Sequence, residues 1–166
     1  LGKLTPALKP RHRAGLFAFW NPKMNLTPHF TLAEFTQSQE AARRGLSNQP
    51  NERIQENLLM TANAMEAVRK LLGGKGIRIS SGYRSLAVNR ALGSKDTSAH
   101  VLGFACDFIC PAFGTPLEIC KAIEASGIRF DQLIEEGTWV HLSIDPRMRQ
   151  QVLTMRNGKY STGLSK

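Results

Sequence analysis

The 166-residue sequence predicts an α+β domain with a small, mainly antiparallel sheet. Between residues 51 and 72, apolar residues recur at spacings of three and four, which indicates a helix with one buried face. Short segments of alternating polarity follow, and Asn157-Gly158 is a strong signal for a hairpin. The length suits one domain with its own hydrophobic core. We expect the helices to pack on one side of the sheet.

The first 23 residues differ from the rest. They hold five basic and no acidic side chains, and three prolines. We expect residues 1–23 to be a leader, a tag or a flexible arm outside the fold, and residues 24–166 to form a single domain. Of the net charge of +9, the domain keeps a surplus of four. That surplus suits an anionic polymer such as a cell wall and is small for a nucleic-acid binder.

The helical elements are marked by their caps. Thr31 and Glu34 form a capping box, and a short helix should follow it and end near Gly45. The long helix should begin after Asn51 and end at Gly73-Gly74. Further helices are expected after residues 81–84, ending near residue 93, and from the capping box at residues 115–118 to about residue 127.

The strands are expected in five segments. They cover residues 77–80, 105–110, 130–134, 138–145 and the hairpin from residue 151 to 161. Residues 135–137 would form the turn between the third and fourth of these segments. In the second, Cys106, Phe108 and Cys110 share one face and Asp107 takes the other.

Three cysteines, an odd and small number, predict free buried thiols and a reducing compartment rather than a disulfide framework. The apolar stretch AGLFAFW is too short for a convincing signal peptide, and no apolar run reaches the roughly 20 residues that span a bilayer. We therefore expect synthesis in the cytoplasm and no membrane insertion.

A metal site is one interpretation of His100, Asp107 and His141. Both histidines sit at or inside predicted strands, and Leu102-Gly103 permits a chain reversal that brings His100 over Asp107. A helix would separate residues seven apart by about 10.5 Å, too far for one ion. Strand alternation places Trp139 and His141 on the face opposite the aliphatic residues. Two imidazoles and a carboxylate suit a catalytic zinc ion, but spacing alone equally fits a coincidence.

Three blocks of sequence add a specific context. SGYRS (residues 81–85) with the following Asn89, SAHVLGFACD (98–107) and FDQLIEEGTWVHLS (130–143) occur in this order. Together they resemble the zinc D-alanyl-D-alanine carboxypeptidases and L-alanyl-D-glutamate endopeptidases of peptidoglycan, in particular their phage-lysin branch. The resemblance covers about residues 28 to 144. It implies one zinc ion, held by His100, Asp107 and His141 on the sheet face away from the helices.

The resemblance also implies roles around the metal. Arg84 matches an arginine that faces the substrate and stabilises the oxyanion, although a surface salt bridge is an alternative for it. Ser98 and Trp139 are expected to contact the substrate, with a loop-capping hydroxyl as the alternative for Ser98. The Leu-Ile-x-Glu pattern selects Glu136 as the general base.

The base is the least determined residue. Several relatives have an acid three residues before the last histidine, where this chain has Thr138. Glu135 therefore stays an alternative to Glu136, and both glutamates also fit a solvated turn.

The sequence thus predicts a zinc metallopeptidase that hydrolyses an amide bond in bacterial peptidoglycan stem peptides, as a carboxypeptidase or an endopeptidase such as a phage endolysin. The alternative is a non-catalytic cell-wall-binding or virion structural module with the same fold. A third hypothesis for the function is a basic nucleic-acid-binding domain. We expect a monomer that acts on the cell wall after release at lysis, with peptidoglycan as its partner and no nucleic acid.

Overall fold

The computed structural model describes residues 21–165. Most of the predicted arm, residues 1–20, lies outside the described residues. Within the rest of the arm, the carbonyl oxygen of Pro22 accepts a hydrogen bond of 2.9 Å from the backbone N–H of Ala33. The elements in chain order are β1 (Asn25–Thr27), β2 (Phe30–Thr31), α1 (Leu32–Thr36), α2 (Gln39–Arg44), α3 (Glu52–Leu71), β3 (Arg78–Ser81), α4 (Leu86–Ala91), β4 (Ala105–Ile109), α5 (Pro116–Ala125), β5 (Gln132–Glu135), β6 (Val140–Ser143), β7 (Gln151–Arg156) and β8 (Lys159–Thr162).

The helices begin where their caps predict. Thr31 and Thr115 each form a complete capping box with the glutamate three residues later, and the Asn51 side chain caps α3. The single short helix expected up to Gly45 is instead two, α1 and α2. Gln37 is extended between them, and the hydroxyl of Ser38 accepts the N–H of Ala41 to start α2.

The main sheet has six strands in the order β3-β4-β6-β5-β7-β8. All neighbouring pairs are antiparallel except β5 and β7, which confirms a mainly antiparallel sheet. The parallel pair has a simple cause. Gln132, the first residue of β5, pairs with Ser143 at the end of β6 and with Gln151 at the start of β7. β7 therefore starts at the same end of the sheet as β5 and runs in the same direction. The connecting loop, residues 144–150, needs only to pass the start of β5.

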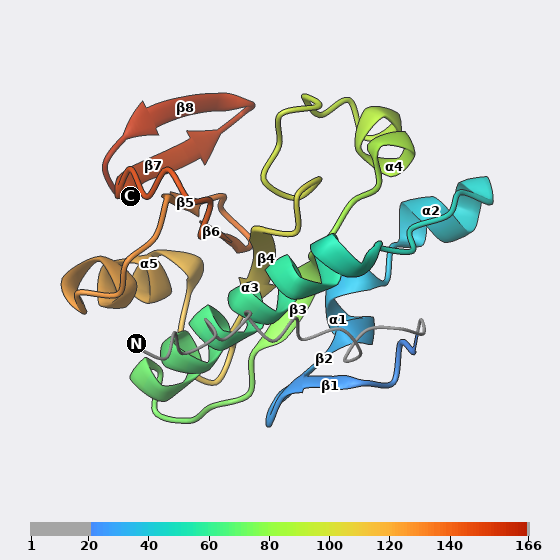
Figure 1. The fold of residues 1–166 in the computed structure, drawn as a ribbon. Coiled ribbons are helices and arrows are strands. Elements are labelled where there is room, and N and C mark those ends of the chain that lie inside the picture. Colours follow the sequence, from blue (N-terminus) through green and yellow to red (C-terminus); the bar gives the residue numbers. More distant parts are fainter. Residues whose placement is uncertain (1–20, 166) are drawn as a thin grey trace, which may run out of the picture.

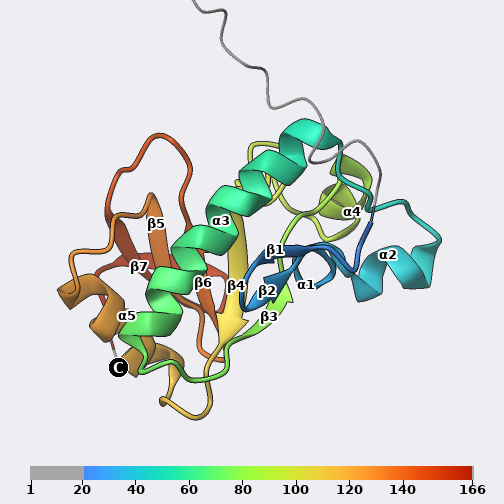
Figure 2. The ribbon, with the colours of Figure 1, turned by 60° about the horizontal axis from the view of Figure 1, so that its bottom comes forward.

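Helices α3 and α5 pack on one face of this sheet, as predicted (Figure 1 and Figure 2). The core between them joins residues of both helices to residues of β4, β5 and β6. It includes Leu58, Met65, Ile119, Ile123, Cys106, Phe108, Leu133, Val140 and Leu142. All three cysteines are buried and unpaired, so the prediction of free thiols is confirmed. Among the described helices, none combines the length and the apolar character that a bilayer span requires.

Candidate metal centre

Strand pairing brings Asp107 and His141 together. Asp107 on β4 is the direct cross-strand partner of His141 on β6. Their neighbours Cys106, Phe108, Val140 and Leu142 belong to the core on the helix side. Because side chains alternate along a strand, Asp107 and His141 both lie on the opposite face. Oδ1 of Asp107 is 2.9 Å from Nδ1 of His141.

His100 comes from a helical turn before β4, and not from a strand end as the sequence indicated. The turn ends at Gly103, whose φ is 75°. Phe104 N–H binds the carbonyl of Ala99 at 3.0 Å, and Gly103 N–H binds that of His100 at 3.2 Å. This pair of bonds is the Schellman arrangement that ends helices at a left-handed glycine. The predicted reversal at Gly103 is therefore confirmed, and it directs His100 back over β4.

Helix α3 holds this turn in place. Asn57 donates its side-chain N–H to the carbonyl of Leu102 at 2.8 Å, and the Thr61 hydroxyl donates to the carbonyl of Gly103 at 2.7 Å. A Cβ atom on Gly103 would lie 3.1 Å from the carbonyl oxygen of Ile54. The absent side chain at Gly103 thus allows the close approach of the turn to the helix.

Gly82 fixes which nitrogen of His100 faces the centre. The carbonyl oxygen of Gly82 lies 2.6 Å from Nδ1 of His100 and can only accept, so Nδ1 carries the proton. Nε2 is then the atom with a lone pair. Gly82 itself packs against Phe35, since an added Cβ would lie 2.7 Å from the Cα of Phe35. The Ser-Gly-Tyr-Arg turn therefore supports the centre through its backbone.

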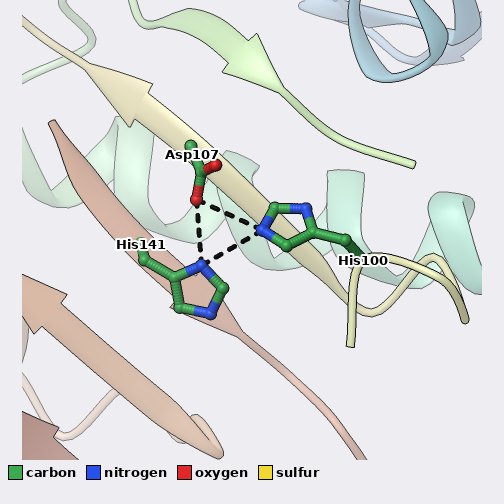
Figure 3. A group of neighbouring side chains, drawn as sticks. All are labelled: His100, Asp107 and His141. Carbon is green, nitrogen blue, oxygen red and sulfur yellow. Dashed lines mark hydrogen bonds and ion pairs between the residues drawn. The ribbon is translucent and has the colours of Figure 1, made fainter. Parts of the chain in front are cut away.

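The three facing atoms lie close enough together to hold one metal ion (Figure 3). Nε2 of His100 is 3.2 Å from Nδ1 of His141 and 3.3 Å from Oδ1 of Asp107. The third distance is the 2.9 Å between Asp107 and His141. Ligands bound tetrahedrally at about 2.0–2.1 Å lie roughly 3.3 Å apart. The spacing of the three atoms is therefore close to that of three ligands of one tetrahedral site.

The protonation states also suit a cation. Burial lowers the pKa of His100, which favours the neutral imidazole that binds metals. Burial raises the pKa of Asp107, but His100 and His141 outweigh it and hold that pKa far below its ordinary value. All three side chains are buried. The donor set, two imidazole nitrogens and a carboxylate oxygen, is one that zinc accepts.

Arg84 lies behind the carboxylate and is not a surface salt bridge. Its Nη2 is 2.7 Å from Oδ2 of Asp107, and its Nε donates to the Ser81 hydroxyl at 3.0 Å. The backbone N–H of Arg84 also binds the carbonyl of His100 at 3.2 Å. Arg84 thus orients Asp107 and joins the strand that carries Asp107 to the turn that carries His100.

A cleft of about 780 Å³ opens over the three residues. The predicted substrate contacts Ser98 and Trp139 both line it, as do Arg84 and Glu136. The Ser98 hydroxyl also accepts the N–H of His100 at 3.4 Å, so the capping interaction that was its alternative is present.

The two glutamates have different surroundings. Glu136 is partly buried in the cleft wall, and burial, followed by the charge of Asp107, raises its pKa. Glu135 is 2% exposed and pairs with Arg156. The expectation that Glu135 belongs to a turn was wrong, because it is the last residue of β5 and pairs with Val140 of β6. Of the two, only Glu136 lines the cleft.

Among the other residues that line the cleft, Arg147 and Tyr160 come from segments that no motif marks. Arg147 belongs to the loop of residues 144–150, and Tyr160 belongs to β8. Both reach the cleft because β7 and β8 are placed beside β5, a pairing between distant segments that no local pattern records.

Comparison with protein families gives one result. The family described as Peptidase M15 matches residues 28–143, which is more than half of the chain. The match includes His100, Asp107 and His141 and ends before the loop of residues 144–150. No curated protein matches the chain.

Proposed function

Because the chain belongs to the Peptidase M15 family, we propose that it is a zinc-dependent peptidase that hydrolyses an amide bond in bacterial peptidoglycan stem peptides. The observation that carries the proposal is the convergence of His100 Nε2, Asp107 Oδ1 and His141 Nδ1 at the floor of a cleft. Their mutual distances fit three of the four positions around a zinc ion. All three residues line the cleft in which a peptide would lie.

Each of the three ligands has a support that fixes its orientation. Gly82 holds the ring of His100, Arg84 holds the second oxygen of Asp107, and strand pairing places His141 beside Asp107. A bound zinc ion supplies Lewis-acid polarisation of a carbonyl group and lowers the pKa of a coordinated water.

Glu136 is the residue that we assign to proton transfer. Its position in the cleft lets it take a proton from the attacking water and give it to the leaving amine. A raised pKa suits this double role, because the carboxyl group must hold the proton between the two steps. The burial of Glu135 and its pairing with Arg156 favour Glu136 over Glu135 for this role.

Arg84 is the candidate for stabilising the negative charge that develops on the substrate oxygen. A guanidinium has five N–H donors. Asp107 and Ser81 engage Nη2 and Nε, and the side chain lines the cleft. The other donors are available to a substrate oxygen.

We further propose that one chain forms the whole active site and acts as a monomer on the cell wall. All the residues named for metal binding and proton transfer come from a single chain. The buried free cysteines fit a protein folded in a reducing compartment, in line with a lysin released at lysis. A digest of purified peptidoglycan decides whether the enzyme is a carboxypeptidase or an endopeptidase.

The test is a digest of purified peptidoglycan by zinc-loaded protein, followed by mass spectrometry of the fragments. We expect new amino and carboxyl termini in the stem peptides, and their positions identify the bond. His141→Ala should lose both the metal and the release of fragments. A wild-type protein that holds zinc and binds the wall but releases no termini would instead be a non-catalytic wall-binding module.

A further inference from the structure

The loop of residues 144–150 places Arg147 at the end of the cleft opposite Glu136. Trp139 directly precedes β6, His141 and Ser143 lie on this strand, and Asp145 follows two residues after its end. Arg147 is bound to Asp145 and lines the cleft, whereas Glu136 and Trp139 lie at the other end of the strands. Along the strands, Glu136 therefore lies toward one end of the cleft and Arg147 toward the other, with His141 between them. The match to the Peptidase M15 family stops at residue 143, before this loop.

The backbone of the loop is held in an unusual conformation. Met148 and Gln150 have φ values of 44° and 52°, which residues with side chains rarely adopt. Hydrogen bonds stabilise these conformations. Met148 N–H binds the carbonyl of Asp145 at 3.0 Å, and Gln150 exchanges two bonds with the backbone of Phe130, at 2.5 and 3.2 Å. Strained backbone that the surroundings hold firmly is common at ligand-binding sites.

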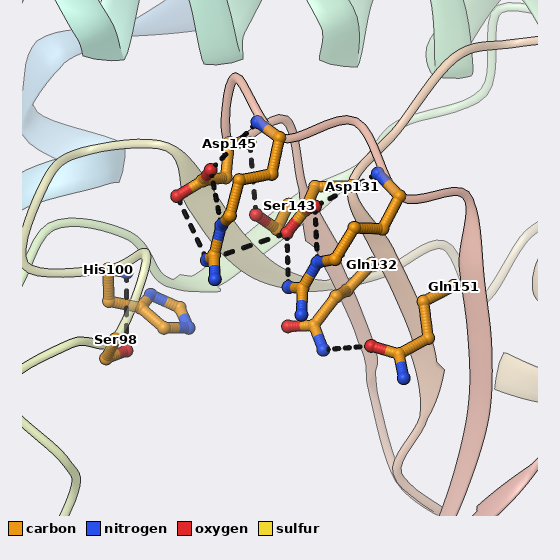
Figure 4. Close-up of polar contacts among 9 residues, drawn as sticks. Ser98, His100, Asp131, Gln132, Ser143, Asp145 and Gln151 are labelled. Carbon is orange, nitrogen blue, oxygen red and sulfur yellow. Dashed lines mark hydrogen bonds and ion pairs between the residues drawn. The ribbon is translucent and has the colours of Figure 1, made fainter.

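Two buried carboxylates, Asp131 and Asp145 (labelled in Figure 4), bind the arginines of this loop. Asp145 accepts bonds from Nε and Nη2 of Arg147 at 2.8 and 3.2 Å. Asp131, which is fully buried, accepts bonds from Nε and Nη2 of Arg149 at 2.8 and 2.6 Å and lies 3.9 Å from Nη2 of Arg147. Arg147 is thus held in one orientation before any ligand arrives, which reduces the entropy lost on binding.

Arg147 keeps donors for a ligand. Its side chain is 54% exposed, and Asp145 occupies only the edge formed by Nε and Nη2. Within residues 21–165, no hydrogen-bond acceptor is assigned to Nη1. The other cleft arginine, Arg84, is directed at Asp107. A planar guanidinium with a free edge matches the geometry of a carboxylate.

We propose that Arg147 is a specificity-determining residue that binds a free carboxylate of the peptide substrate. The inference rests on the proposed function, since the ligand is a stem peptide. Such a peptide has two kinds of free carboxylate, at its C-terminus and on its glutamate unit. Both offer the same chemistry, and the experiment separates them.

The experiment compares three synthetic stem pentapeptides as substrates of the zinc-loaded enzyme. One has both carboxylates free, one has the C-terminus amidated, and one has the glutamate carboxylate amidated. For the wild type, we expect one of the two amidations to raise KM roughly ten- to hundredfold, as the loss of a charge-assisted pair predicts. We expect kcat to change less than about threefold, because the contact is made equally in substrate and transition state.

Variants test whether Arg147 causes the preference for the free over the amidated peptide. Arg147→Gln should raise KM for the free peptide by a similar factor and remove the preference between free and amidated peptides. Arg147→Lys, which keeps the charge, should retain part of the preference even where the Gln variant fails to fold. Arg129→Gln changes an exposed arginine outside the cleft and should behave as the wild type.

Three results would overturn the inference. If the wild type hydrolyses all three peptides with the same KM, Arg147 is not a carboxylate site, although the peptidase function stands. If the Lys variant shows the full wild-type preference, the guanidinium group of Arg147 does not recognise the carboxylate, and the inference is wrong. If zinc-loaded wild type cleaves neither peptides nor peptidoglycan, the proposed function fails, and the inference fails with it.

Discussion

Arg84 and Asp107 form an ion pair in which Nη2 lies 2.7 Å from Oδ2, the carboxylate oxygen not in contact with either histidine. This pair aims Oδ1 at the metal position. We predict that Arg84→Gln weakens zinc binding about 10- to 100-fold, in addition to any effect on catalysis. Chelator competition measures the affinity. Arg90→Gln removes an exposed ion pair with Asp96 and should leave zinc affinity unchanged. Equal affinities for the wild type and the Arg84 variant would contradict the prediction.

The neighbouring glutamates form a matched pair of variants. Glu136→Gln should lower kcat by about 10²- to 10⁴-fold while the protein keeps its zinc, since an amide cannot carry the proton. Glu135→Gln should act mainly on stability, because it breaks the buried pair with Arg156. Kinetics on wall fragments and elemental analysis of both variants provide the measurements. If the two substitutions lower kcat equally, Glu136 is not the base.

Gly103 links the fold to the metal centre. Gly103→Ala forces a side chain onto a residue with φ of 75° and places its Cβ 3.1 Å from the carbonyl oxygen of Ile54. Gly127→Ala imposes the same backbone penalty, about 1–2 kcal/mol, with no atom within 4 Å of the added Cβ. We predict that only Gly103→Ala also weakens zinc binding, because it displaces the turn that carries His100. Urea unfolding and chelator competition on both variants test this, and equal zinc affinities would refute it.

Asp131 makes stability depend on pH. The Arg149 guanidinium holds the pKa of Asp131 below its ordinary value of 3.8. The stabilisation is therefore complete above pH 3.8 and is lost as the pH falls further, through the folded-state pKa. Asp131→Asn should lower the free energy of unfolding by about 2 kcal/mol at pH 7, and this difference should shrink below pH 3.8.

Urea unfolding at several pH values measures this effect. The matched control is Asp96→Asn, which removes an exposed pair with Arg90 and should have a far smaller effect. A difference between wild type and Asp131→Asn that stays constant down to pH 2 would show that Asp131 does not titrate in this way.

Local signals in the sequence predict local structure well in this protein. Each capping box joins residues three apart, and both Thr31 and Thr115 cap their helices as expected. Asn157 and Gly158 have positive φ values of 51° and 73°, as a tight hairpin turn requires. Strand alternation also assigns Cys106 to the core and Asp107 to the opposite face. These features depend only on neighbouring residues, so no tertiary contact can easily change them.

Contacts between distant segments were not predictable in the same way. The salt bridge of Arg84 with Asp107 and the parallel pairing of β5 with β7 depend on how the loops fold. Glu135 illustrates the limit. Whether it ends a strand or belongs to the turn depends on the register between β5 and β6, which the glutamate pair itself does not determine. The motifs predict which three residues form the candidate metal site, but only the structure shows that their ligand atoms lie close together.

Helix α3 contributes no ligand, yet Asn57 and Thr61 hold the turn that carries His100. We therefore expect ion binding at the proposed site and docking of this helix to be thermodynamically linked. Ion binding should stabilise the docked position of the helix. Detachment of the helix should release the turn that carries His100 and so weaken ion binding. The three residues thus connect helix α3 with the main sheet. An engineered copy of this site on another sheet would also need a helix that holds the turn carrying His100.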